Sequence, residues 1–270
     1  MTFSQVIAVV TLALLEGALV ALPKAHALER LGRLRSPAWA AVPPGTILVG
    51  TFGLLALPSM APGLTLLASV ATPLLAALAV LFVARGQRAA LLSVAIAVAL
   101  AAALTSGWLG QLSASTLTAL GCLPLGAAIV RLTSNRWAPV GVLAMCAIDA
   151  TLLASGIGQP AFAMIADATA RIHGPVLNEA AIDSISTDYP DLLLAAVMGG
   201  IVAGHTIQWR AAVLVATRAV SYGMLLPVVD PLPATVPIAL AYILLRWGRL
   251  PPRWQMAPAA PDAARERVSG

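Results

Sequence analysis

The chain has 270 residues, of which 60% are hydrophobic and only 10% are charged. A soluble domain has about 25% charged residues, so the composition excludes a single water-soluble core and indicates a multi-pass membrane protein. The formal net charge of +5 would suggest nucleic-acid binding in a soluble protein. In a membrane protein it is typical of basic cytoplasmic loops, so we expect no nucleic-acid partner.

Nine segments are apolar enough to be predicted as membrane-spanning helices of about 20 residues. In chain order they lie at about 4–22, 38–58, 63–84, 89–107, 113–130, 138–156, 190–208, 211–229 and 232–247. The first segment contains Glu16 and follows no positive charge, so we interpret it as a retained span and not as a secretory signal peptide. The sequence therefore predicts an all-α membrane protein with nine transmembrane helices.

The basic residues predict the orientation of these spans. Fourteen of the 16 Lys and Arg residues follow the first, third, fifth, seventh or ninth span, and the other two are Arg171 and Arg218. Because short cytoplasmic loops are rich in Lys and Arg, this alternation predicts that the N-terminus lies outside and the C-terminus lies in the cytoplasm. We expect the protein to reside in the cell membrane, in contact with the lipid bilayer.

The same pattern suggests how the chain is organised. We divide it into an N-terminal five-span half (1–136), a half with spans six to nine (137–250) and a tail (251–270). The tail is rich in Pro, Ala and charge, so it is predicted to be disordered and cytoplasmic. The longest loop, 157–189, is expected outside the cytoplasm. It contains AFAMIADATARI, whose apolar face predicts a helix along the membrane surface.

Three acidic residues lie inside or at the start of predicted spans: Glu16, Asp149 and Asp191. A charge at the membrane centre costs about 2.5–3.5 kcal/mol on insertion scales, so such residues suggest a function. Each also has a structural interpretation. We expect Glu16 to pair with Arg218 of the eighth span, and Asp149 could form a hydrogen bond between helices. Asp191 could form a capping-box-like helix start with Asp188.

Asp149 and Asp191 together suggest a catalytic pair, because successive antiparallel spans can bring them together inside the bundle. Two carboxyls a few ångströms apart cannot both ionise, so the pair shares a proton. One carboxyl can then activate a water molecule while the other protonates the amide oxygen. This is aspartic protease chemistry, and it needs no metal or other cofactor. Cys122 and Cys146 lack metal-ligand spacing and are predicted to be buried free thiols.

With these residues, the chain resembles the presenilin and signal peptide peptidase family of intramembrane aspartyl proteases. That family has nine spans, a Tyr-Asp motif on span six, a Gly-x-Gly-Asp motif on span seven and a Pro-Ala-Leu motif at the start of span nine. Here Asp149 and Asp191 fall on predicted spans six and seven. Pro233 and Ala234 stand in the Pro-Ala-Leu place. The resemblance covers residues 138–247 by motif.

The chain departs from the family pattern in three places. Ile148 precedes the first Asp, Asp188-Tyr189-Pro190 precedes the second, and Thr235 replaces the Leu. Glycine before the second Asp would let the backbone unwind, whereas proline removes an N–H and cannot flex. These changes leave open an active enzyme that has diverged or a member that has lost activity.

The resemblance implies a presenilin-like bundle that cleaves single-span membrane proteins or signal-peptide helices. The implied catalytic residues are Asp149 and Asp191, and the implied substrate-binding residues are Pro233, Ala234, Thr235, Tyr189 and Pro190. Two other functions stay open: a proton-coupled transporter that uses the intramembrane acids, and a non-catalytic membrane scaffold. Prepilin peptidases also use membrane aspartates, and DLLLAAVMGG is similar to the run after their second Asp. They lack the Pro-Ala-Leu feature.

Overall fold

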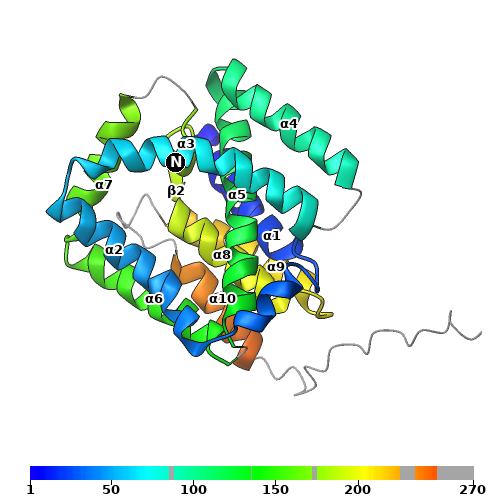
Figure 1. The fold of residues 1–270 in the computed structure, drawn as a ribbon. Helices are drawn as coiled ribbons and strands as arrows, with labels where there is room; N and C mark the ends of the chain where they lie inside the picture. Colours follow the sequence, from blue (N-terminus) through cyan, green and yellow to red (C-terminus); the bar gives the residue numbers. More distant parts are fainter. Residues whose placement is uncertain (85–87, 135, 172–174, 226–234, 248–270) are drawn as a thin grey trace, which may run out of the picture.

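The computed structural model describes residues 1–84, 88–134, 136–171, 175–225 and 235–247 (Figure 1). Helices dominate this part of the chain. In order they are α1 (Phe3–Ala21), η1 (Glu29–Leu34), η2 (Pro37–Ala41), α2 (Val42–Ala56), α3 (Met60–Leu78), the π-helical η3 (Ala79–Val83), α4 (Arg88–Leu104), α5 (Gly107–Leu132), α6 (Ala138–Ala154), α7 (Gly158–Ala170), α8 (Tyr189–Val202), α9 (Gln208–Gly223) and α10 (Thr235–Trp247). The strands β1 (Glu179–Ile182) and β2 (Ile185–Asp188) form an antiparallel hairpin before α8.

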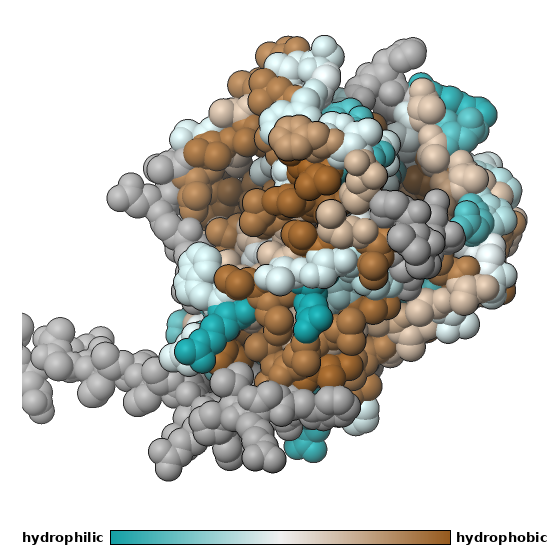
Figure 2. All heavy atoms as spheres, turned by 180° about the vertical axis from the view of Figure 1, so that it is seen from behind, coloured by the Kyte–Doolittle hydropathy of each residue, from teal (hydrophilic) through white to brown (hydrophobic). Residues whose placement is uncertain are grey.

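Within the described residues, four helical segments are long and apolar enough to cross a membrane, namely α1, η2 with α2, α3 with η3, and α5. The pair α6 and α7 adds a fifth if it is counted as one span, although the two helices meet at 90°. Large apolar side chains lie on the outside, with Phe3 82%, Leu104 79% and Val49 75% exposed. Figure 2 shows broad hydrophobic areas on one face of the molecule. These are the features of a multi-pass helical membrane protein.

Each of the nine segments predicted as spans contains a helix. However, α4, α8, α9 and α10 have only 17, 14, 16 and 13 residues, fewer than the about 20 that a straight span needs. The count of nine spans therefore stays a prediction. The helix predicted within the loop 157–189 is present as α7. Ile172 of its predicted apolar face and the predicted tail, 251–270, lie outside the described residues.

The hairpin β1–β2 is not among the predicted elements. Each strand has only four residues, too few for an alternating pattern to stand out. Its burial comes from tertiary packing, because Ala180 and Ile182 are fully buried and β1 packs against α5. Asp183 makes the turn with a positive φ of 56°, which Asp tolerates better than most residues. The Ser4 hydroxyl donates a hydrogen bond to Asp183 and so ties α1 to this turn.

Helix α1 packs inside the bundle against α8 and α9. Two glycines allow the close approach. A Cβ at Gly17 would lie 3.0 Å from the Cβ of Ala216 on α9, and a Cβ at Gly199 on α8 would lie 2.3 Å from the Leu19 carbonyl oxygen. At the end of α1, the Gln208 amide nitrogen donates to the carbonyl oxygens of Val20, Ala21 and Pro23, which have no helical partner there.

Candidate functional site

A cavity of about 140 Å³ lies between α2, α6, α7 and the start of α8. We call it the acidic cavity, because Asp149 on α6, Asp188 at the end of β2 and Asp191 on α8 all line it. Pro190 lines it as well. Its other walls come from α2 and α7: Thr46, Ile47, Gly50, Thr51, Leu54, Ala161, Phe162 and Ile165. The fold therefore brings the two predicted catalytic acids to one cavity.

The start of α8 places two of these acids. Asp188 occupies the N-cap position with extended backbone, but its side chain makes no capping hydrogen bond and lines the cavity instead. Asp191, one turn later, is 6% exposed. Its carboxyl interacts with the backbone N–H of Asp188. Only one half of the predicted capping-box arrangement is therefore present, because the half that the Asp188 side chain would make is missing.

The acidic side chains of the bundle interact electrostatically with one another. Asp191 interacts electrostatically with Asp188, with Asp149 and with Glu16 of α1. Asp188 lies outside the spanning helices, and burial together with the charges of Glu179 and Asp149 raises its pKa to about 6. Glu179 faces Asp188 across the hairpin, and burial raises the pKa of its carboxyl too. Negative charge is thus concentrated where β2 enters α8.

The first residue of α10 forms a hydrogen bond with Asp149. The Thr235 hydroxyl donates a hydrogen bond of 2.7 Å to Asp149 Oδ2. One turn earlier on α6, the Cys146 thiol donates to the Thr235 carbonyl oxygen at 3.4 Å. One turn of α6 thus binds the first residue of α10 at two points. Thr235 was predicted to contact substrate, and the structure places its hydroxyl on a predicted catalytic acid. Pro233 and Ala234 lie outside the described residues.

Tyr189, also predicted to bind substrate, does not line the acidic cavity as the described residues form it. It packs against the hydrophobic core, and its carbonyl oxygen lies 3.9 Å from the Cys122 sulfur. Cys122 and Cys146 are both free and buried, as predicted. Sequence reasoning treated Asp188 only as a helix cap. Its spacing of three residues from Asp191, which puts both on one helix face, would have indicated a shared cavity.

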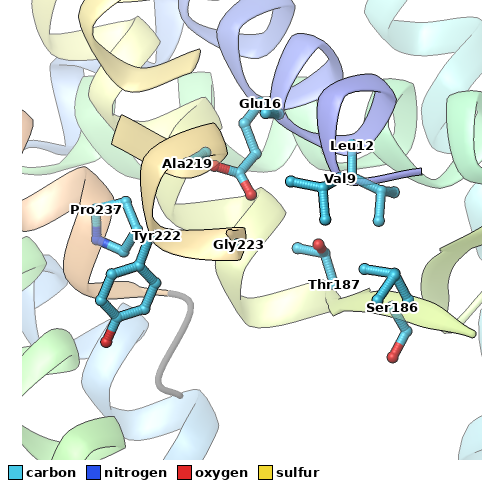
Figure 3. Close-up of a pocket in the computed structure, with 11 residues that line it drawn as sticks. Val9, Leu12, Glu16, Ser186, Thr187, Ala219, Tyr222, Gly223 and Pro237 are labelled. Carbon is cyan, nitrogen blue, oxygen red and sulfur yellow. The ribbon is translucent and has the colours of Figure 1, made fainter. Parts of the chain in front are cut away.

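A second cavity, of about 90 Å³, lies between α1, β2, α9 and α10. We call it the Glu16 cavity. Figure 3 shows the Glu16 carboxyl pointing from α1 into the space beside Thr187, Tyr222 and Gly223. Glu16 is 4% exposed, and its Oε2 atom has no hydrogen-bond partner in the part of the chain that the structure describes. A buried polar atom of this kind is rare in native structures and calls for an explanation.

The ion pair predicted between Glu16 and Arg218 is not formed. Among the described residues the ion pairs are His26–Glu29 and Asp167–Arg171, and Arg218 is exposed. The reason is the helix face that α9 turns toward α1. Gly17 of α1 packs on Ala212 and Ala216, which leaves Arg218 on the outside of α9.

No group of three or more His, Cys, Asp or Glu side chains is placed to hold a metal ion in the part of the chain that the structure describes. No protein-family model, curated protein sequence or solved structure matches this chain. The function must therefore be inferred from the geometry of the acidic cavity and from the chemistry of the acids that line it.

Proposed function

We propose that the protein is an intramembrane aspartyl protease that hydrolyses peptide bonds with Asp149 and Asp191. The observation that carries the proposal is that these two acids, on different helices of an apolar bundle, line one cavity and interact electrostatically. Intramembrane acids are costly and mark functional sites. Two carboxyls that share a cavity can divide the acid and base roles of amide hydrolysis between them.

We assign the base to Asp149 and the acid to Asp191. Asp149 accepts a hydrogen bond from Thr235, and hydrogen bonds to a carboxylate favour its ionised form. Asp149 takes a proton from water as the water oxygen bonds to the peptide carbonyl carbon. Asp191, more deeply buried and near other acids, gives its proton to the carbonyl oxygen. When the C–N bond breaks, the leaving nitrogen receives the proton held by Asp149. Asp191 takes back a proton from one of the two hydroxyl groups on the former carbonyl carbon, so both acids return to their starting state.

The size of the acidic cavity bears on the substrate. An α-helix with its side chains is about 10–12 Å across, which is too wide for a cavity of about 140 Å³. The substrate helix must therefore unwind near the cleaved bond. In our proposal the bundle is presenilin-like, with nine spans and the N-terminus outside, so that span six runs outward and span seven inward. A substrate then fits in one direction, with its own N-terminus in the cytoplasm, as in signal-peptide remnants and type II single spans.

The test is a cleavage assay with the purified protein in liposomes and fluorogenic single-span substrates. Asp149→Asn and Asp191→Asn should each abolish cleavage while the proteins keep the helical circular dichroism of the wild type. Asp183→Asn, at the exposed hairpin turn, is the matched control and should cleave normally. Activity in either variant of the pair would refute the catalytic assignment.

A second assay tests the direction of the substrate. Matched type I and type II substrates with the same apolar segment are offered to the wild-type protein. A cytoplasm-only reporter is fused in turn to each terminus. We expect cleavage of the type II substrate and a reporter that is active only at the C-terminus. Cleavage confined to type I substrates would refute the substrate class, and a reporter active only at the N-terminus would reverse the orientation.

One observation favours a second candidate, a proton-coupled transporter. Glu16 interacts with Asp191, which in turn interacts with Asp188 and Asp149, so acids reach across the bundle as in a proton relay. A transporter requires proton movement driven by a solute gradient in liposomes, and Glu16→Gln should abolish it. A wild-type protein that neither cleaves substrates nor moves protons would instead be a scaffold of the same fold.

A further inference from the structure

The Glu16 cavity and the acidic cavity have no lining residue in common. They meet where β2 passes into α8, because Thr187 lines the Glu16 cavity and the next residue, Asp188, lines the acidic cavity. The acidic cavity is walled by α2, α6 and α7, whereas the Glu16 cavity is walled by α1, α9 and α10 (Figure 3). A peptide that fills the acidic cavity therefore leaves the Glu16 cavity free.

Two lining residues of the Glu16 cavity are linked to the proposed catalytic pair. Glu16 interacts electrostatically with Asp191, and Tyr222 interacts electrostatically with Asp149. Pro237, also on the wall of the cavity, lies two residues after Thr235, whose hydroxyl binds Asp149. The Glu16 cavity thus lies within electrostatic range of both catalytic acids, although neither of them lines it.

The chemistry of the lining favours water as the occupant. Among the described residues the Glu16 Oε2 atom is buried without a hydrogen-bond partner, and the hydroxyl of Thr187, on the wall of the cavity, points toward the same space (Figure 3). The hydroxyls of Ser186 and Tyr222 point away from the Glu16 carboxyl in this view. A buried water needs two to four polar partners and about 10–15 Å³ of space, and this cavity offers about 90 Å³. A metal ion is less suited, because no group of three ligating side chains exists among the described residues.

We propose that the Glu16 cavity holds water and supplies the molecule that hydrolysis consumes. This inference rests on the proposed function. One water is used for each peptide bond: its oxygen bonds to the carbonyl carbon, and its protons end on the two new chain ends. While a bound peptide closes the acidic cavity, replacement water reaches Asp149 and Asp191 from the Glu16 cavity. Glu16 anchors that water, and its role is positioning, not catalysis.

Hydroxyl-radical footprinting of the protein in liposomes, read by mass spectrometry, tests the hydration without any cleavage. Leu12 and Pro237 are buried and line the cavity, so their oxidation should report internal water. Met145 and Met198, fully buried in the core, should stay unmodified. Ala219→Leu fills the cavity and should suppress labelling of Leu12. Thr217→Leu, a matched change on the exposed face of α9, should not.

Cleavage kinetics test the supply. Ala219→Leu and Glu16→Leu should each lower kcat about tenfold, or about 1.4 kcal/mol, with KM unchanged. Glu16→Gln, which still binds water, and Thr217→Leu should match the wild type. A rise in KM with unchanged kcat would place the cavity on the peptide path and overturn the proposal.

The outcomes also separate this inference from the proposed function. Leu12 left unlabelled in the wild type would refute a hydrated cavity even if the protein is a protease. If Ala219→Leu loses the labelling of Leu12 but keeps the wild-type kcat, only the role of the cavity in supplying water is refuted. A wild-type protein that labels Leu12 but cleaves nothing would overturn the proposed function and the supply role, and would leave the hydrated cavity standing.

Discussion

Replacing Asp188 with Asn should stabilise the protein, and only at neutral or higher pH. Burial and the charges of Glu179 and Asp149 raise the pKa of Asp188 from 3.8 to about 6. The folded protein therefore holds a proton that the unfolded chain has already released between about pH 4 and pH 6. Stability falls as the pH rises through this window, and the full loss is present above it.

The expected gain in the free energy of unfolding follows from the shift in the pKa of Asp188. One pKa unit corresponds to about 1.4 kcal/mol, so the shift corresponds to about 3 kcal/mol. Asp188 is only partly buried, which makes this an upper bound. Asn is as good as Asp at an N-cap, and the Asp188 side chain makes no capping hydrogen bond that could be lost. We expect Asp188→Asn to add about 1–3 kcal/mol at pH 8 and almost nothing at pH 4.

The assay is equilibrium unfolding in mixed detergent micelles at both pH values, followed by circular dichroism. Asp183→Asn at the exposed turn is the control and should show no pH-dependent gain, because it removes no buried charge. The reasoning is wrong if Asp188→Asn destabilises the protein at pH 8, or if its gain is equal at pH 4 and pH 8.

Three further predictions concern single contacts. Thr235→Val should lower kcat about 10- to 100-fold with KM unchanged, because a hydrogen bond to a charged group is worth about 1.5–3 kcal/mol. Thr235→Ser keeps the hydroxyl and should keep the rate. Equal rates in both variants would contradict a role for the hydrogen bond to Asp149. Gly199→Ala should destabilise the protein by more than about 1–3 kcal/mol in the same unfolding assay, since its Cβ would meet the Leu19 carbonyl oxygen at 2.3 Å. Gly53→Ala, where a Cβ would meet no described atom within 4 Å, should be neutral or stabilising. Gln208→Leu should cost about 1–3 kcal/mol or more because three carbonyl oxygens lose their donor; a thermal midpoint equal to the wild type would refute this.

Periodicity and composition predicted the helices well, because apolar segments of this length have few alternatives in a membrane. All nine predicted segments contain helix, and α7 was predicted from its apolar face. The lengths of the helices were predicted less well. The segment 190–208 ends as a helix at Val202, and the chain then turns through Gly204 with a positive φ of 80°. A hydropathy window does not register such a turn, because the apolar run 192–203 outweighs the polar residues that follow Gly204.

The site was predictable where it depended on chain order and not where it depended on packing. Asp149 and Asp191 stood out as isolated acids, and the structure places both on one cavity. Asp188 was missed as a cavity residue because its N-cap position offered a sufficient local explanation. The failed pairing of Glu16 with Arg218 has a similar origin. Residue spacing identifies a helix face, but only the contact of Gly17 with Ala216 decides which face of α9 meets α1.

The packing of α1 has a consequence for synthesis. Val20 at the end of α1 and its partner Gln208 are 188 residues apart, and a ribosome adds about 5–20 residues per second. The first helix therefore waits about 10–40 s in the bilayer before α9 exists to receive it. During that time Glu16 has neither the walls of its cavity nor the neighbouring acids. Assembly of this bundle must finish by closing the last helices around the first, and truncation before α9 should leave α1 without its main partner.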